Sequence, residues 1–207
     1  VRKTSAGYDE TTNSISWEFE INQNGCNLEN LWVEDALDVS SQVWTGGICE
    51  KKDLILTAYK RNAVDMPQQD EKSRNRVVKY LTREDAKVSD GDWYTVYEHE
   101  GKQVFRLHLK DLKADQYYRF WLQTTVTDSS YINQKFTVTN TASYWIQPGG
   151  EASAREVSAS QEITHSLLQK SVVPFVYKDG TARDYDFESH TVKWKVRLND
   201  HGLPLTN

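Results

Sequence analysis

The sequence lacks several features that would point to common classes of protein. It has no uninterrupted apolar run of about 18 residues, which excludes a membrane-spanning helix. One methionine and few stretches rich in Ala, Leu and Glu leave little material for long helices. Neither a glycine-rich phosphate loop nor a GxSxG elbow occurs. The net charge is −5 and the Lys and Arg residues are scattered, which argues against a nucleic-acid binder.

Cysteine is scarce as well. Cys26 and Cys49 would form a disulfide in an exported protein, or would remain two thiols. They do not form a CxxC pair and no cluster of histidines accompanies them, so we expect no metal site and no cofactor. No signal peptide opens the chain, which begins Val1-Arg2-Lys3, and we therefore expect a mature segment of a longer protein.

What the chain does contain favours β-structure. Its 207 residues can bury a proper core, and 11 Tyr and 7 Trp suit the half-buried surfaces of strands. Apolar and polar residues alternate in many short segments, as they do along strands. These segments are residues 14–22, 31–37, 54–59, 93–98, 104–110, 118–126, 137–144 and 155–164.

The segments between these strands are of two kinds. Residues 22–25 and 99–102 are turn sequences, whereas residues 38–51 look like a loop. Residues 60–92 are highly charged, and we expect excursions there or a short helix at residues 75–81. The sequence thus predicts an all-β fold, an immunoglobulin-like (Greek-key) β-sandwich with long loop insertions.

Part of the chain is present twice. Residues 191–199 repeat the pattern of residues 14–22, with Trp194 matching Trp17, 177 residues on (194 − 17). Lys170 precedes the second copy as Lys3 precedes the first. We therefore expect residues 1–168 to form one complete repeat and residues 169–207 to form the first strands of a following one. Without partner strands, that fragment would pack on the first domain or exchange into another molecule.

Three polar residues fall on the apolar faces of separate predicted strands. Asn140 shares a face with Val138 and Ala142, and Asp35 lies on the inward parity of residues 31–37. If residues 1–5 form the first strand, Lys3 points inward too. An amide buried without partners costs roughly 2–7 kcal/mol, so a partner or a reaction is expected at Asn140.

The three residue types suit one reaction. Desolvation lowers the pKa of a buried lysine and raises that of a buried aspartic acid. Neutral Lys3 would be a nucleophile, and protonated Asp35 would polarise the carboxamide of Asn140 and carry the proton as ammonia departs. The product would be an intramolecular isopeptide bond, which is made once and not turned over. The chain would then not be an enzyme in the ordinary sense.

Simpler interpretations exist for each residue. Lys3 could be a solvated terminal residue, Asp35 could cap a turn, and Asn140 could satisfy a backbone group. Trp32 and Trp121 are outward by parity, and could be covered by loops or by a neighbouring domain, or face a ligand. The five histidines lie in loops or at outward positions, which speaks against a catalytic or metal role. They are His99, His108, His165, His190 and His201.

The order of several motifs resembles the collagen-binding-type (CnaA-like) domains of Gram-positive cell-wall adhesins and pilins. The motifs are KTSAGYD at 3–9, SISW at 14–17, LENLWVEDAL at 28–37, FRLHLKDL at 105–112 and TNTA at 139–142. The resemblance covers most of residues 1–165, and the second copy extends it. It implies an isopeptide site whose lysine, aspartate and asparagine map to Lys3, Asp35 and Asn140. One departure is Ala36, where a threonine commonly follows the aspartate.

The resemblance implies a structural or adhesive repeat, a stalk or adhesin module, of a bacterial cell-surface protein. Its location would be extracellular and attached to the cell wall, with the anchor outside this chain. Neighbouring repeats of the same protein would be its partners. An alternative is a ligand-binding module for a host matrix protein such as collagen or fibrinogen. A further alternative is an accessory carbohydrate-binding β-sandwich, although the sequence offers no convincing pair of carboxylates for an enzyme.

Overall fold

The structure is a computed structural model that describes residues 1–46, 48–50, 54–60, 76–81, 83, 91–128, 135–147, 150–164, 168–186 and 188–198. Almost all regular structure in these residues is antiparallel β, apart from a 3-10 helix at Glu151–Ser153. No helix among them is long and apolar enough to cross a membrane. The chain divides into two units, residues 1–128 with 137–162, and residues 129–136 with 163–207.

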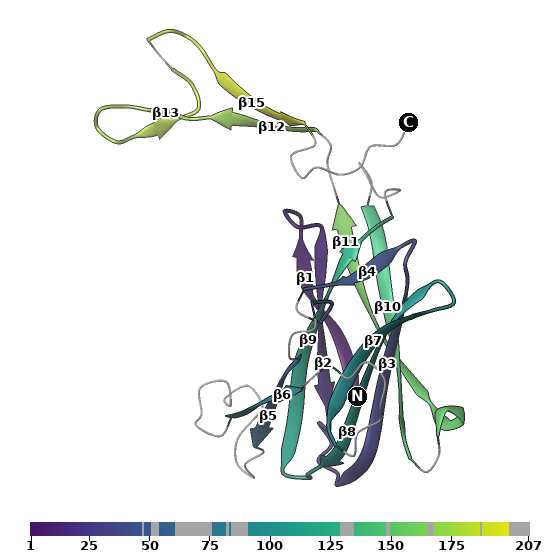
Figure 1. The fold of residues 1–207 in the computed structure, drawn as a ribbon. Coiled ribbons are helices and arrows are strands. Elements are labelled where there is room, and N and C mark those ends of the chain that lie inside the picture. The colour runs from purple at the N-terminus through teal and green to yellow at the C-terminus, as the bar shows by residue number, and fades with distance from the viewer. Residues whose placement is uncertain are drawn as a thin grey trace. The chain divides into compact units, whose positions relative to one another are not determined.

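The first unit contains two sheets (Figure 1). One sheet, here sheet A, has the strand order β1-β2-β9-β5-β6, and β4 also pairs with β9. Its strands are β1 (Arg2–Asp9), β2 (Ser14–Ile21), β4 (Gln42–Thr45), β5 (Leu54–Lys60), β6 (Arg76–Leu81) and β9 (Gln116–Val126).

The second sheet, sheet B, has the order β11-β10-β3-β8-β7. Its strands are β3 (Leu28–Asp38), β7 (Trp93–His99), β8 (Lys102–Leu112), β10 (Lys135–Ile146) and β11 (Arg155–Thr164). The edge strands β1 and β11 meet at the side of the sandwich, where Ser5 Oγ donates a hydrogen bond to Gln161 Oε1 at 2.5 Å. The first strand of the chain therefore closes against the last strand of the unit.

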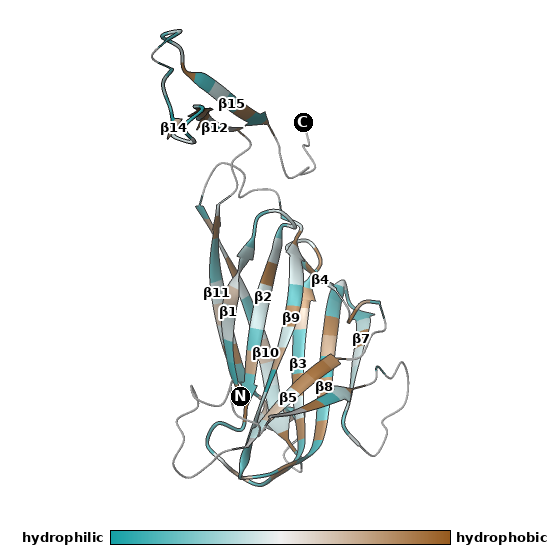
Figure 2. Cartoon of the chain, turned by 90° about the vertical axis from the view of Figure 1, so that its left-hand side faces the viewer, coloured by the Kyte–Doolittle hydropathy of each residue, from teal (hydrophilic) through white to brown (hydrophobic). Residues whose placement is uncertain are grey.

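The core lies between the two sheets and is strongly aromatic. Phe19 of β2 stacks on Phe120 of β9 with ring centroids 4.6 Å apart, and Phe120 contacts Phe105 of sheet B at 6.0 Å. All three rings are fully buried. Figure 2 shows the alternation of hydrophobic and hydrophilic residues along the strands that produces this interior. The predicted all-β, immunoglobulin-like sandwich is confirmed.

Two local expectations were wrong. The described part of residues 75–81 does not form a helix, because residues 76–81 pair with β5 as strand β6. Residues 38–51 are not all loop, because β4 pairs with β9 and buries Gln42 and Trp44. The alternation in β4 is hidden in the sequence, since one of its two inward residues is polar. The insertion at residues 61–75 and 84–90 lies outside the described residues.

The second unit contains two small antiparallel pairs. β12 (Leu168–Val173) pairs with β15 (Lys193–Leu198), and β13 (Phe175–Val176) pairs with β14 (Ala182–Arg183). Large apolar side chains of β15 are open to solvent, with Trp194 54% and Val196 58% exposed. The matching side chains of β2, Trp17 and Phe19, are fully buried in the first unit.

Candidate functional site

Lys3 projects from the edge strand β1 into the sandwich. It lies opposite Phe19 of β2. A β-bulge between Ser5 and Gly7 shifts the register only after Lys3, so the inward direction of the Lys3 side chain is unaffected. Gly7 has a φ of 126°, which a residue with a side chain rarely adopts. The side chain of Lys3 is fully buried. Its Nζ atom donates a hydrogen bond of 2.5 Å to Oδ2 of Asp35, across the gap between the sheets.

Asp35 lies in β3, in the middle of sheet B. Its neighbours across the sheet are Ala142 of β10 on one side and Phe105 of β8 on the other. Asp35 is completely buried, and Lys3 is the cation that it contacts.

Asn140 lies in β10, two residues before Ala142 and on the same face of the strand. Only 2% of its surface is exposed. Among the described residues, neither its Nδ2 atom nor Oδ1 of Asp35 has a hydrogen-bond partner of good geometry. Asn140 is nevertheless near enough to help lower the pKa of Asp35. A buried donor without a partner costs about 1–3 kcal/mol. The amide nitrogen Nδ2 carries two N–H donors and an isopeptide nitrogen carries one, so release of Nδ2 as ammonia would reduce this cost.

Burial changes the acid–base properties of the pair. It lowers the pKa of Lys3 to about 8, although the charge and hydrogen bond of Asp35 oppose the change. Burial raises the pKa of Asp35 to about 6, against the charge and hydrogen bond of Lys3 and the amide of Asn140. Two aromatic rings strengthen the desolvation, since Nζ lies 5.5 Å from the ring centroid of Trp17 and 5.0 Å from that of Phe19.

These changes make proton transfer within the pair accessible. The ordinary pKa values of 10.5 and 3.8 differ by 6.7 (10.5 − 3.8), whereas the values in this site, about 8 and about 6, differ by about 2. Burial thus brings the two pKa values closer together, which lowers the cost of moving a proton from Nζ to the carboxylate. The site can therefore present a neutral amine beside a protonated acid.

The structure brings together the three residues that the sequence singled out, although their roles remain a prediction. The sequence did not assign the aromatic walls, Trp17 and Phe19, to the site. It also missed the polar pair behind Trp17, which is Thr124 of β9 and Gln42 of β4. Thr124 is a polar residue in an otherwise apolar inward row, and that signal could have identified it.

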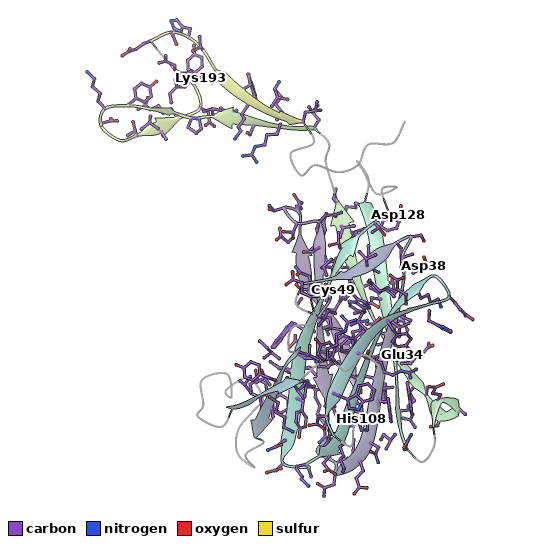
Figure 3. The ribbon with its side chains drawn as sticks, viewed as in Figure 1. Glu34, Asp38, Cys49, His108, Asp128 and Lys193 are labelled. Carbon is purple, nitrogen blue, oxygen red and sulfur yellow. The ribbon has the colours of Figure 1, made fainter. Side chains whose placement is uncertain are left out.

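Other candidate residues lie elsewhere. Cys26 and Cys49 are free, exposed thiols rather than a disulfide; Figure 3 labels Cys49 on the sandwich. His108, also labelled there, lies on the outer side of β8 but is buried, and its Nδ1 contacts the carbonyl oxygen of Gly91 at 2.8 Å. It packs on Trp32, which also stacks on Trp145 with centroids 6.0 Å apart. Trp32 is thus covered, whereas Trp121 is 45% exposed.

The second unit reproduces part of the site geometry. Lys170 lies opposite Val196, as Lys3 lies opposite Phe19. The residues opposite the two lysines, Phe19 and Val196, are 177 residues apart (196 − 19), the same spacing as Trp17 and Trp194. Nζ of Lys170 lies 4.2 Å from the ring centroid of Trp194, as Nζ of Lys3 lies over Trp17. The sequence repeat is therefore also a repeat of strand register and of lysine placement.

Comparisons with known proteins gave structural similarities alone. No family model matches the chain, and no curated protein matches it. The collagen-binding domain of a Staphylococcus aureus adhesin is similar at 13% identity, with a TM-score of 0.39, over 79% of this chain and 96% of that chain. The collagen-binding subdomain of the Enterococcus faecalis surface protein ACE has 14% identity and a TM-score of 0.41, over 76% and 92%.

A third similar structure is the group B streptococcus pilus 2b backbone protein. It has 10% identity and a TM-score of 0.42, over 95% of this chain and 79% of that chain. At these values, the function has to be inferred from the residues of the site.

Proposed function

We propose that Lys3 and Asn140 form an intramolecular isopeptide bond with Asp35 as the proton shuttle. The neutral Nζ atom of Lys3 attacks Cγ of Asn140, while protonated Asp35 hydrogen-bonds to the carboxamide. A C–N bond forms, the bond from Cγ to Nδ2 breaks, and Asp35 relays the amine proton to the leaving nitrogen, so that one ammonia is released. The observation that carries the proposal is the buried contact of Lys3 with Asp35, beside an asparagine whose Nδ2 makes no hydrogen bond of good geometry to the described residues.

The bond would serve a mechanical role. It would join β1, the edge strand of sheet A, to β10 in sheet B, and so tie the start of the unit to its penultimate strand. A chain pulled from its ends would carry the load through this link rather than through the strands between. Together with the motif resemblance, this supports a stalk or adhesin repeat of an extracellular, cell-wall-attached bacterial surface protein. A single-turnover cross-link of this kind is not enzymatic activity.

Intact mass spectrometry of the purified chain tests the proposal. The wild-type mass should be lower than the sequence mass by one ammonia. Lys3→Ala and Asp35→Ala should each restore the full mass after allowance for the substitution, because they remove the nucleophile and the proton shuttle. Lys102→Ala, at an exposed lysine, is the matched control and should keep the deficit. A wild-type chain of full mass would end the proposal.

A second candidate function is binding of a host matrix protein such as collagen or fibrinogen. One observation favours it: a hollow of about 510 Å³ on sheet A has the exposed ring of Trp121 beside Ile55 and uncharged polar residues. Surface plasmon resonance on immobilised collagen and fibrinogen should then show binding that Trp121→Ser abolishes. Tyr80→Ser, at another exposed aromatic residue, is the control. Absence of binding to both proteins would exclude these ligands.

We also propose that the second unit is the opening hairpin of a following repeat, as the shared register of Lys170 and Lys3 suggests. Its outward charges differ from those of the first unit. Glu18 and Glu20 of β2 face Arg119 of β9, with contacts of 3.5 and 2.7 Å. The corresponding residues of β15 are basic, Lys195 and Arg197. If β15 replaced β2 in another molecule, like charges would meet at Arg119, so the hairpin is not suited to exchange between copies.

A further inference from the structure

A chain of buried hydrogen bonds begins at the indole of Trp17. Its Nε1 atom donates to Oγ1 of Thr124 at 3.0 Å, and this hydroxyl donates to Oε1 of Gln42 at 2.9 Å. Trp17 and Thr124 are fully buried, and Gln42 is 3% exposed. A hydroxyl has one proton, so donating to Gln42 leaves its lone pairs to accept from the indole. The direction of both hydrogen bonds is therefore fixed.

These three residues come from three strands that lie side by side in sheet A. Trp17 belongs to β2 and Thr124 to β9, which pair with each other. Gln42 is the first residue of β4, and this strand pairs with residues 123–126 of β9. The hydrogen bond from Thr124 to Gln42 thus exists only when the short strand β4 has joined the sheet.

The indole of Trp17, which these hydrogen bonds hold, forms one wall of the site around Lys3. Nζ of Lys3 lies 5.5 Å from the ring centroid of Trp17 and 5.0 Å from that of Phe19. Phe19 is fixed by its stacking on Phe120, at an angle of 8° between the ring planes. Trp17 is fixed instead by its hydrogen bond to Thr124. The amine therefore lies beside two rings, each held by a partner in β9.

We propose that Thr124 and Gln42 are positioning residues for the cross-link. They hold the Trp17 ring at the angle that directs Nζ of Lys3 toward Asn140, and they do not touch the reacting atoms. This inference rests on the proposed isopeptide bond and identifies what orients its nucleophile. Small errors of placement slow reactions between fixed groups strongly, since a displacement of about 1 Å can cost roughly 100-fold in rate. Because Gln42 is in β4, the second hydrogen bond, and the faster reaction that depends on it, form only after β4 has paired with β9.

The test measures the rate of ammonia loss in freshly folded molecules. The full chain is made by cell-free synthesis, samples are quenched in denaturant at intervals, and intact mass gives the cross-linked fraction. Protease resistance of parallel samples gives the folded fraction, so the rate can be expressed per folded molecule. Thr124→Val, which keeps the shape and removes the hydroxyl, should slow this rate about 10-fold, which corresponds to a loss of one well-placed hydrogen bond.

Three further variants separate positioning from folding. Thr124→Ser restores the hydroxyl and should return the rate to within about threefold of wild type, the margin that context effects allow. Thr125→Val, the next residue of β9 on its opposite face, should leave the rate unchanged. Gln42→Met keeps the bond from Trp17 to Thr124 but frees the hydroxyl, so it should slow the rate less than Thr124→Val does. It also serves as the test if Thr124→Val fails to fold.

The outcomes are distinguishable. A wild-type rate per folded molecule in both Thr124→Val and Gln42→Met would overturn the positioning role while leaving the cross-link intact. Equal slowing by Thr124→Ser and Thr124→Val would also overturn it, because the hydroxyl would then not matter. A wild-type chain that never loses ammonia would instead refute the proposed bond, and the positioning role with it.

Discussion

The buried pair of Lys3 and Asp35 should give the uncross-linked protein an unusual dependence of stability on pH. The suitable variant is Asn140→Ala, which removes the electrophile and leaves the pair in place. A lysine whose pKa is lower in the folded than in the unfolded protein destabilises the folded state while it is charged. For Lys3 this destabilisation is fully present below pH about 8 and is lost as the pH rises toward 10.5.

The magnitude follows from the pKa change. The folded and unfolded pKa values of Lys3 differ by about 2.5 (10.5 − 8), which corresponds to on the order of 3 kcal/mol at about 1.4 kcal/mol per unit. Between pH 8 and about 9.5 the free energy of unfolding should therefore rise by about 2 kcal/mol. Asp35 acts in the opposite direction. Its raised pKa makes stability fall as the pH rises from 3.8 to about 6. The pair therefore lowers the free energy of unfolding most between pH about 6 and about 8.

Urea unfolding followed by tryptophan fluorescence measures the effect. The control is the double variant Asn140→Ala/Lys3→Met, which lacks the lysine and should lose the alkaline rise. Asp35 does not cancel, because loss of Lys3 raises its pKa further and so opposes any alkaline rise in the double variant. Groups outside the pair that titrate in this range are present in both chains and cancel in the difference. They include Cys49, whose pKa is raised by burial, and the amino group of Val1, whose pKa is lowered by burial. The same alkaline slope in both chains would refute the idea that Lys3 is buried and charged at neutral pH.

Two more predictions concern the core and the second unit. In the Asn140→Ala background, Phe19→Ala should lower the free energy of unfolding by about 3–5 kcal/mol, whereas Tyr80→Ala, at a 65% exposed side chain, should change it by less than about 0.5 kcal/mol; urea unfolding of both variants checks this. The chain should be monomeric by light scattering, because Lys195 and Arg197 would meet Arg119 in an exchanged dimer. A dimer that Trp194→Ser abolishes would contradict this, since it would show that β15 does insert.

The fold was predictable where one face of a strand is apolar. Residues 14–22 and 118–126 alternate cleanly, and they form the paired strands β2 and β9 in the centre of sheet A. The expectation was wrong for β4, which is four residues long, and for β6, which lies within the charged segment 60–92. Their pairing with β9 and β5 depends on contacts distant in sequence, and local propensity does not report such contacts.

The site was predictable for a related reason. A polar residue on an apolar face is rare, so Asp35 and Asn140 stood out by parity, and Lys3 joined them once residues 1–5 were taken as a strand. Strand order could not be obtained in this way, because parity says which face a residue is on but not which strand lies opposite. Gln42 illustrates the limit. It is an ordinary residue in an apparent loop, and its role emerges only when β4 is placed next to Thr124.

The position of the proposed bond determines how much of the unit could extend under force. A link from residue 3 to residue 140 encloses every strand of the first unit from β2 to β9 within one covalent loop. β11 lies outside it, held to β10 by strand pairing and by side-chain hydrogen bonds such as Thr141 to Ser158 at 2.7 Å. Pulling should therefore release only residues 141–164, 24 residues (164 − 140), or about 80 Å at roughly 3.5 Å per residue.

Without the bond, residues 1–164 all extend, to about 570 Å at the same rise. Single-molecule stretching of the chain should then show a short step in wild type and a long step in Asn140→Ala. A long step in the wild-type chain would contradict the proposed load path. The short step breaks the Ser5 to Gln161 contact of β11 and also unpairs residues 142–146 of β10 from β3. β11 and the end of β10 would act as a reversible extension, and the covalent bond would set its limit.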